Sequence, residues 1–236
     1  YIEKKWPDEL VGLGRNNVHY ISPVFDQVCH NSKILDAVES IIGKDILVGG
    51  TTLFIKDPDN KGFVSWHQDA KCNGLKPFNS VTACLALTEV NVEDGYMYMW
   101  LGSHVNGERE HDTHGEDNLS RRGQTVANVP DNKTVVIELK PGQLSLHHPW
   151  IVHGSGQNTS QKRRVGLAIQ SYLATDVEQI NGKTFVQLGR GIDEYNHHPH
   201  VVRATGLMVE PEVKYWNKAN KALQGVLYYG AKKLGK

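Results

Sequence analysis

The hydrophobic positions near the start of the chain recur with the spacing of a helix. Between Asn31 and Gly43 they fall three or four residues apart, at Ile34, Leu35, Val38, Ile41 and Ile42. Side chains with this spacing share one face of an α-helix, which is then buried. Asn31 or Ser32 can cap the first turn, and Gly43 can end the helix, because glycine suits the backbone conformation common at helix C-termini. The pattern predicts a helical N-terminal part over residues 1–45.

From about Ile46 the pattern changes to short runs of strand-forming residues. Turn-forming segments separate the runs, for example Asp57-Pro-Asp-Asn and Lys140-Pro-Gly. The runs are Leu47–Lys56, Gly62–Asp69, Val81–Val90, Tyr96–Trp100, Thr134–Leu139, Gln143–His147, Ile151–Ser155 and Arg164–Leu173. Many short strands in succession, with helices before and after them, are typical of a closed or sandwiched antiparallel barrel. We therefore expect a mainly β core over residues 46–175.

Two further segments complete the expected architecture. After Pro211 an apolar stripe predicts a last helix, with the members Trp216, Ala219, Leu223, Val226 and Leu227. The stretch Ser103–Val129 is polar and too long for a plain connection, which favours a functional loop or lid. We expect a single domain over residues 1–236 that is mainly β with flanking helices. Its parts are the helical segment, the β core, and a C-terminal tail and helix over residues 176–236.

Composition narrows the functional classes. The 236 residues include 26 Lys plus Arg and 26 Asp plus Glu, so the formal net charge is zero. A balanced charge gives no general attraction to nucleic acid or to an anionic membrane, and no apolar run approaches the roughly 18 residues of a membrane-spanning helix. Three cysteines without a CxxC pair favour a reducing compartment. We expect a cytoplasmic protein that acts on a small molecule; the sequence does not indicate an oligomeric state.

Histidine content directs attention to a metal. The chain has 12 histidines, and His67 and Asp69 are two residues apart in a predicted strand, so their side chains should project to the same side. His153, from a remote strand, could supply a third ligand. Two imidazoles and one carboxylate suit Fe(II), because three coordination positions stay open, whereas zinc normally takes a fourth protein ligand or a single water. A His-x-Asp pair alone is weak, since such pairs also occur on surfaces.

An arginine on the next predicted strand strengthens the hypothesis. A guanidinium there can bind the far carboxylate of a dicarboxylic cosubstrate through two parallel hydrogen bonds. Arg164 alternates with Gly166, Ala168 and Gln170, which leave space for a ligand, whereas Arg163 alternates with the apolar Val165, Leu167 and Ile169. Strand phase therefore favours Arg164 over Arg163.

The same phase argument identifies a small, mildly polar row in Val81–Thr88. Its members are Thr82, Cys84, Ala86 and Thr88. This face can line a cavity, and Thr82 can donate a hydrogen bond to a cosubstrate carboxylate. On the neighbouring run, Gln143, Ser145 and His147 form a second polar row that is hard to explain as core.

Taken together, these segments resemble the phytanoyl-CoA dioxygenase family of Fe(II)/2-oxoglutarate oxygenases. The matching stretches are Trp66-His67-Gln68-Asp69-Ala70, Glu93-Asp-Gly with Leu101-Gly-Ser-His104, His153-Gly-Ser-Gly-Gln-Asn158 with Arg163-Arg164-Val-Gly-Leu167, and the tail segment Arg190-Gly-Ile-Asp-Glu-Tyr195. The resemblance implies a double-stranded β-helix, which is a jelly-roll barrel with flanking helices. It also implies that His67, Asp69 and His153 bind Fe(II), that Arg164 pairs with 2-oxoglutarate, and that Ser155 lies near this cosubstrate.

The resemblance further implies the reaction. Such an enzyme uses O2 and decarboxylates 2-oxoglutarate to succinate while it hydroxylates an unactivated C–H bond of a small molecule, such as a natural product or metabolite. Related halogenases carry Gly or Ala in place of the carboxylate to open a halide site. The carboxylate of Asp69 therefore favours hydroxylation over chlorination, although desaturation or ring closure could follow the same hydrogen abstraction.

Two segments depart from the family pattern. Many relatives have a tryptophan near the cosubstrate where this chain has Cys84, so that wall is expected to be looser. Gly95–Trp100 replaces the usual Gly-Cys-Met-Arg-type strand and puts Tyr96, Tyr98 and Trp100 in one phase. We expect Trp66, Tyr98 and Trp100 to shape the substrate pocket. The open alternative is that these aromatic residues pack against a helix.

Other functions stay open at this point. An acyl-CoA hydroxylase of the phytanoyl-CoA type would need anion-binding groups, for which Arg121, Arg122, Lys162 and Arg163 are candidates, although there is no Gly-rich phosphate loop. A non-catalytic ligand-binding jelly roll would need neither the carboxylate nor the arginine. A cupin-like dioxygenase would not use 2-oxoglutarate. His111 and His114 also have metal-like spacing, but a polar loop of this kind is usually solvated.

Overall fold

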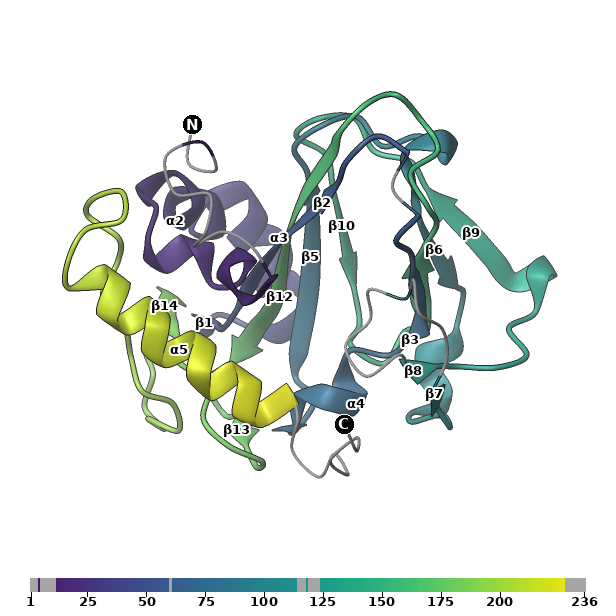
Figure 1. Cartoon of the computed structure of the whole chain (residues 1–236). Coiled ribbons are helices and arrows are strands. Elements are labelled where there is room, and N and C mark those ends of the chain that lie inside the picture. Colours follow the sequence, from purple (N-terminus) through teal and green to yellow (C-terminus); the bar gives the residue numbers. More distant parts are fainter. Residues whose placement is uncertain (1–3, 5–11, 60, 114–117, 119–123, 228–236) are drawn as a thin grey trace, which may run out of the picture. The chain divides into compact units, whose positions relative to one another are not determined.

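The structure is a computed structural model, which describes residues 4, 12–59, 61–113, 118 and 124–227. The chain forms two compact units. Unit 1 comprises Tyr1–Leu53, Asn73–Val81 and Ile169–Lys236, and unit 2 comprises Phe54–Cys72 and Thr82–Ala168. The chain passes from one unit to the other at four places along its sequence, which Figure 1 colours from purple to yellow. The expectation of a single domain over the whole chain stays a prediction.

Unit 1 contains the flanking helices. They are α2 (Pro23–Cys29), α3 (Ser32–Ile42) and α5 (Glu212–Leu227), with the short 3-10 turns η1 (Gly12–Arg15) and η2 (Val18–Tyr20) before them. The predicted N-terminal helix is confirmed: the Asn31 side chain accepts a hydrogen bond from the backbone of Lys33. Gly43 ends the helix with a φ of 91°, which favours glycine. Four of its five apolar residues are buried, but Ile41 is exposed.

The last helix is confirmed as well. Trp216, Ala219 and Val226 are buried on one face of α5, and the Trp216 indole donates to the backbone carbonyl of Asn16 at 2.8 Å. The strands of unit 1 centre on β1 (Ile46–Val48), which pairs antiparallel with the end of β12 (Arg164–Ala174) and with β14 (Gln187–Arg190). A smaller pair joins β4 (Leu75–Lys76) to β13 (Glu178–Gln179).

One predicted strand is split. The expected run Leu47–Lys56 is two strands, β1 and β2 (Thr51–Lys56), which are separated by Gly49 and Gly50. A Cβ atom at Gly49 would lie 2.9 Å from the Ser171 side chain, closer than real Cβ contacts. Gly49 therefore allows a close approach to the backbone at Ser171, at the point where the strand is interrupted.

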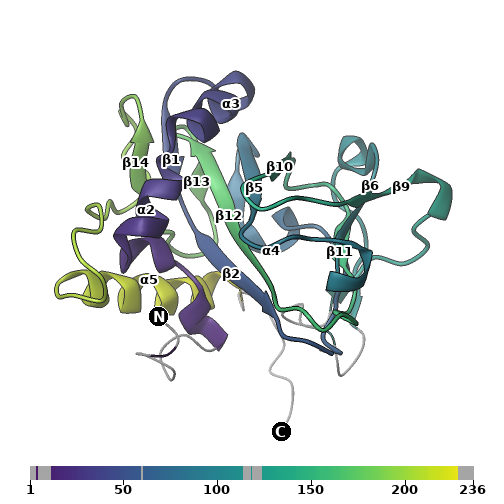
Figure 2. The same ribbon diagram turned by 90° about the horizontal axis from the view of Figure 1, so that it is seen from above.

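Unit 2 holds two β-sheets that face each other (Figures 1 and 2). In the first, β5 (Ser80–Ala86) pairs antiparallel with β10 (Leu144–His147). The second has the order β3-β11-β6-β9, with β3 (Val64–His67), β11 (His153–Ser155), β6 (Met97–Trp100) and β9 (Thr134–Ile137). Met97, Met99 and Ile151 form an apolar cluster against which Cys84 of β5 packs, so side chains fill the space between the sheets.

Shorter elements connect these strands. They are α4 (Ala70–Asn73), η3 (Val92–Asp94), η4 (Ser103–Asn106), β7 (Asp112–Thr113), β8 (Gln124–Thr125) and η6 (Asp131–Lys133). The long segment expected to be a functional loop or lid is thus partly regular, because β7 and β8 pair antiparallel. Its residues 114–117 and 119–123 lie outside the described part of the chain.

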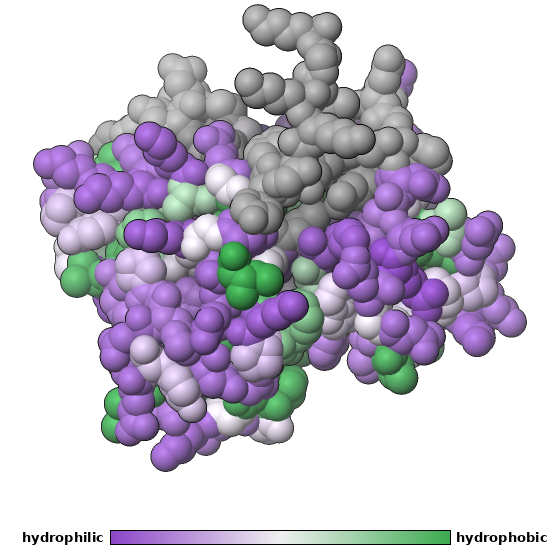
Figure 3. All heavy atoms as spheres, turned by 90° about the horizontal axis from the view of Figure 1, so that it is seen from below, coloured by the Kyte–Doolittle hydropathy of each residue, from purple (hydrophilic) through white to green (hydrophobic). Residues whose placement is uncertain are grey.

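The fold is mainly β with flanking helices, and its two facing antiparallel sheets are those of a jelly roll. This confirms the expected fold class. Among the described residues, strand pairing does not link the two sheets of unit 2 into a closed barrel, so the sandwiched arrangement is the one observed. On the face shown in Figure 3, hydrophobic residues are scattered among hydrophilic ones. No helix in the described ranges is long and apolar enough to cross a membrane.

Candidate metal centre

Two of the predicted ligands lie on neighbouring strands. His67 at the end of β3 is the register partner of His153 at the start of β11, and the two ring centroids are 4.2 Å apart. Each imidazole places its Nδ1 against the backbone carbonyl two residues earlier, at 2.8 Å from Ser65 and 3.1 Å from Ile151. A hydrogen on Nδ1 satisfies these carbonyls and leaves the Nε2 lone pair of each ring available for a metal.

Asp69 completes the group from a turn rather than from the strand. β3 ends at His67, and Asp69 immediately precedes the short helix α4. The backbone N–H of Ala70 donates to the Pro149 carbonyl at 3.1 Å, which holds this turn in place. Asp69 Oδ1 lies 3.5 Å from His67 Nε2 and 3.9 Å from His153 Nε2. His67 and Asp69 do lie together, as expected. The expected reason, alternation of side chains along one strand, was wrong, because Asp69 lies in a turn.

The burial and the charges around the three groups shift their pKa values, and these shifts bear on cation binding. Burial alone would raise the pKa of the Asp69 carboxyl, but the imidazoles of His153, His147 and His67 hold it well below its usual value. Burial, and then the proximity of His67, lower the pKa of His153 to about 3. Burial lowers the pKa of His67 as well, but the Asp69 carboxylate outweighs it and the net shift is upward. The site thus offers a carboxylate and a neutral His153, which are the protonation states that bind metals.

The donor set fits a divalent metal with open coordination positions. One ligand atom from each of His67, Asp69 and His153 lies within 4.8 Å of the others, and no fourth His, Cys or carboxylate joins this group within the described ranges. Two imidazoles and one carboxylate on one side of a metal suit Fe(II). A closed structural zinc site would need a fourth protein ligand.

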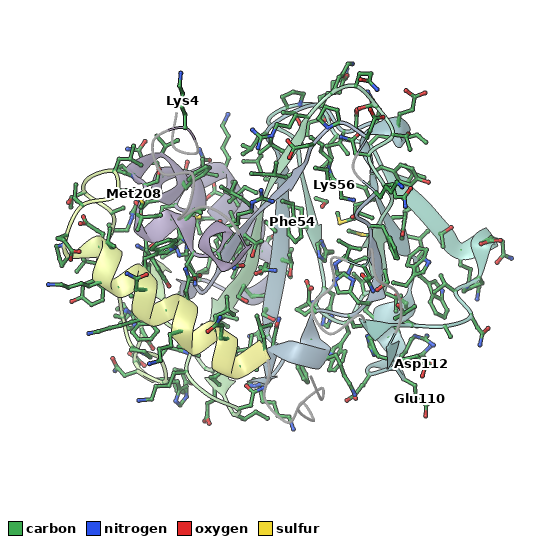
Figure 4. All side chains as sticks on the ribbon, viewed as in Figure 1. Lys4, Phe54, Lys56, Glu110, Asp112 and Met208 are labelled. Carbon is green, nitrogen blue, oxygen red and sulfur yellow. The ribbon has the colours of Figure 1, made fainter. Side chains whose placement is uncertain are left out.

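Gln68, between the two ligands, anchors a neighbouring loop. Its side chain is 1% exposed, and its Nε2 donates to the Trp150 carbonyl at 2.6 Å and to the Gly107 carbonyl at 2.9 Å. Its Oε1 accepts from the backbone N–H of Arg109 at 2.9 Å, and its own backbone N–H points to His111 Nε2 at 3.2 Å. The segment 107–111 is thereby held against the ligand turn, while Glu110 and Asp112 point outward at the periphery (Figure 4).

The two neighbouring arginines have different environments. Arg163 is exposed, and its Nε lies 2.8 Å from Asp57 Oδ1. The Arg164 guanidinium is largely buried, and its Nη1 donates to the Gly95 carbonyl. Burial lowers the pKa of Arg164, while Cys84 and Asp94 act in the opposite direction. Arg164 has the position expected for a cosubstrate arginine, whose binding role stays a prediction.

Lys56 is the residue that the sequence analysis missed. It lies at the end of β2 (Figure 4), is 2% exposed, and its Nζ donates to Ser155 Oγ at 2.8 Å and to the Gly156 carbonyl. Burial, and then the charge of Arg164, lower the pKa of Lys56 to about 7. Within the described residues, neither Lys56 nor Arg164 forms an ion pair with a carboxylate. Two buried basic side chains that are not ion-paired with a carboxylate are typical of an anion-binding site.

The small polar row of β5 lies beside the polar row of β10, because residues of the two rows are register partners. His147 is opposite Thr82, and Ser145 is opposite Cys84. Ser145 Oγ, both ring nitrogens of His147 and Nε of Arg164 are buried without a hydrogen-bond partner in the described part of the chain. Unpaired buried polar atoms are costly, so they indicate where a ligand would bind. Thr82 Oγ1 donates to Asp69 Oδ2 at 3.3 Å, whereas we expected a contact with the cosubstrate.

The predicted pocket aromatics come together on the other face of their sheet. The rings of Trp66 and Tyr98 are 4.2 Å apart, and the Arg109 guanidinium lies 4.1 Å from the Trp100 ring centre. Tyr98 and Trp100 alternate along β6 with Met97 and Met99, which face the interior. Gly154 allows this arrangement, because a Cβ atom there would be 2.6 Å from the Tyr98 ring. The placement gives no support to a substrate-lining role, which stays a prediction.

Two other candidate groups do not come together among those of their members that the structure describes. Of the basic residues considered for a CoA substrate, Arg163 pairs with Asp57 and Lys162 lies 4.0 Å from Glu89. Arg121 and Arg122 lie outside the described residues, as does His114. His111 contacts the Gln68 backbone and joins no metal-binding group in the described ranges.

Comparison with known proteins identifies the family. The pattern of the family described as phytanoyl-CoA dioxygenase (PhyH) matches residues 6–166. The phytanoyl-CoA dioxygenase domain-containing protein 1 homolog of Caenorhabditis elegans is 29% identical over 170 residues, which cover 69% of this chain and 59% of the relative. The peroxisomal phytanoyl-CoA dioxygenase of Homo sapiens is 26% identical over 161 residues, which cover 66% and 47%. The chain therefore spans about half to three fifths of these relatives.

Solved structures share the fold of this chain. The apo form of ThoJ, a non-heme monooxygenase, matches with a TM-score of 0.80 at 27% identity, and the match covers 90% of this chain and 78% of ThoJ. CytC3 with Fe(II) and alpha-ketoglutarate matches with a TM-score of 0.61 at 19% identity and covers 86% and 79%, which shows a shared fold. With the family pattern matched over more than half of its length, this chain belongs to the phytanoyl-CoA dioxygenase family.

Proposed function

We propose that this protein is an Fe(II)- and 2-oxoglutarate-dependent dioxygenase that hydroxylates an unactivated C–H bond of a small molecule. One observation carries the proposal: unit 2 combines a His67–Asp69–His153 donor group with the two buried cations Lys56 and Arg164. A metal with open coordination positions would bind to the donor group, and a dicarboxylate would bind to the two cations. A ligand-binding jelly roll without catalysis would need neither.

Each residue has a definite part in this proposal. His67, Asp69 and His153 would hold the iron, which supplies the activation of O2 and the oxidation of the C–H bond, with 2-oxoglutarate converted to succinate. Arg164 and Lys56 would bind the cosubstrate carboxylate that is remote from the metal, and Ser155 would orient Lys56 through the hydrogen bond between them. Burial of both cations strengthens their attraction to an anion, because water does not screen them.

The relatives' names support this class of reaction. ThoJ is described as a non-heme monooxygenase, and a relative from Stutzerimonas stutzeri, 27% identical over 169 residues, is described as a probable alpha-ketoglutarate-dependent hypophosphite dioxygenase. The second description names alpha-ketoglutarate, and the first names no substrate, so these relatives support the cosubstrate rather than a particular substrate. We infer a small organic substrate. We also infer a cytoplasmic location, in keeping with the unpaired thiols of Cys29 and Cys84.

The proposal is tested by anaerobic loading with Fe(II) and 2-oxoglutarate, followed by exposure to O2 with a panel of candidate substrates. Succinate and a product heavier by one oxygen are expected from the parent chain. Omitting 2-oxoglutarate separates this function from that of a cupin-like dioxygenase, and Asp69→Ala serves as the control without an intact metal site. Iron binding without any binding of 2-oxoglutarate would refute the proposal.

A further inference from the structure

The two carboxylate oxygens of Asp69 face different partners. Oδ1 is the atom nearest to the other candidate ligands, at 3.5 Å from His67 Nε2 and 3.9 Å from His153 Nε2. Oδ2 instead faces Thr82 Oγ1 at 3.3 Å and His147 Nε2 at 3.9 Å. One oxygen is thus directed to the metal position and the other to the protein.

Thr82 and His147 reach Oδ2 together because of strand pairing. They are register partners on the antiparallel strands β5 and β10, so their side chains lie side by side on one face of that sheet. Asp69 comes from the turn that follows β3, in the opposite sheet of unit 2. On the side of the first sheet, the carboxylate therefore accepts a hydrogen bond from Thr82 and has the His147 imidazole nearby, while its backbone follows a strand of the second sheet.

No hydrogen bond in the described part of the chain explains why His147 is buried. Its side chain is 1% exposed, and neither ring nitrogen has a hydrogen-bond partner among the described residues. An imidazole buried without hydrogen-bond partners is costly, and Asp69 Oδ2 lies 3.9 Å from its Nε2. The separation of 3.9 Å is longer than a hydrogen bond, and contacts of this kind commonly shorten when a site is loaded.

We propose that Thr82 and His147 are positioning residues that hold Asp69 as a one-oxygen ligand, with Oδ1 on the metal and Oδ2 bound to the protein. This inference rests on the proposed function. An octahedral metal has about six positions, and a bidentate carboxylate with two imidazoles would occupy four of them. A keto acid that binds through two atoms would then fill the rest. Holding Oδ2 away from the metal keeps one position for O2.

The test uses Co(II), whose visible absorption reports coordination number, under anaerobic conditions and without turnover. Thr82→Val and His147→Phe keep the size of each side chain but remove the donor. Each is expected to weaken Co(II) binding about 10- to 100-fold and to change the absorption spectrum. Thr82→Ser and His147→Gln keep a donor and should restore most of the affinity and the parental spectrum.

Two matched controls separate this role from general structural effects. Thr134→Val removes a threonine hydroxyl that bonds to the Asp131 carbonyl, and His104→Phe replaces an exposed imidazole, both in unit 2. Neither should change Co(II) affinity. The inference is overturned if folded Thr82→Val and His147→Phe bind Co(II) with parental affinity and spectrum. Binding of 2-oxoglutarate to the Co(II)-loaded parent is measured separately, and its failure would reject the proposed function instead. If His147→Phe does not fold, Thr82→Val and His147→Gln still decide the question.

Discussion

Lys56 Nζ lies 2.8 Å from Ser155 Oγ, and Ser155 is two residues after His153 on the same strand. The contact connects a buried cation on β2 to the strand that carries a candidate metal ligand. Because side chains two residues apart on a strand share a face, Ser155 and His153 both project into the interior of unit 2. One short strand therefore carries both a candidate metal ligand and the hydroxyl that contacts Lys56.

The buried charge of Lys56 should make stability depend on pH. Its pKa is about 7 in the folded chain and 10.5 in the reference state, so between these values the unfolded chain binds more protons. The destabilisation is full below about pH 7 and declines as pH rises. Lys56→Met should therefore increase the free energy of unfolding more at pH 6 than at pH 9, by about 2–3 kcal/mol.

Urea denaturation at the two pH values measures this difference. Lys140→Met removes an exposed lysine of unit 2 and serves as the matched control, with the same small effect at both pH values. An equal effect of Lys56→Met at pH 6 and pH 9 would show that Lys56 is not held charged in an apolar environment.

Arg164 and Arg163 should differ in their contribution to cosubstrate binding. Arg164→Leu removes a buried guanidinium and should weaken binding of 2-oxoglutarate to the metal-loaded chain by roughly 2–5 kcal/mol. Arg163→Leu removes only an exposed pair with Asp57, which should change binding by less than about 1 kcal/mol. Anaerobic calorimetry measures both. Equal losses, or a larger loss for Arg163→Leu, would reverse the assignment.

Removal of either histidine ligand should abolish stoichiometric metal binding. His67→Ala or His153→Ala leaves a metal with two of its three protein ligands, and turnover should be lost together with the iron. Metal content after dialysis is the measurement. His197→Ala, an exposed histidine of unit 1, is the control and should retain the parental iron content. Parental iron affinity in either ligand variant would show that the ligand set is wrong.

The Gln68 side chain should control the mobility of segment 107–111. Gln68→Glu replaces the donor to the Gly107 and Trp150 carbonyls with an oxygen that repels them. Hydrogen exchange of the backbone amides in this segment should become faster, with little change in the strands of unit 2. Gln143→Glu keeps the acceptor for the Lys140 N–H and is the matched control. Unchanged exchange in Gln68→Glu would mean that other contacts hold the segment.

Asp69 should direct the reaction to oxygenation. As a ligand, its carboxylate would take the coordination position that a halide needs, so chloride should not ligate the iron of the parent chain. Turnover in 18O2 with excess chloride should give a product that carries labelled oxygen and no chlorine, as measured by mass spectrometry. A chlorinated product from the unmutated chain would mean that Asp69 is not a metal ligand.

Local sequence patterns determined the elements and the candidate ligands. The spacing between Asn31 and Gly43 and the capping residues predicted α3 correctly, because a helix is specified by contacts within a few residues. Strand phase also separated Arg164 from Arg163, and the structure shows one buried and the other exposed. The metal group was predicted from His67, Asp69 and His153, and the structure brings these residues together.

Only the tertiary structure decided which faces meet. Alternation along β6 grouped Tyr98 with Trp100, but pairing with β11 places that row on the face opposite to the candidate ligand His153. No local pattern marked Lys56, because its burial depends on Ser155 and Gly156, about a hundred residues later in the chain. Likewise, the contact of Thr82 with Asp69 depends on two sheets that face each other. A sequence specifies which side chains share a face of their own element, whereas the environment of that face is fixed by strands that are distant in the chain.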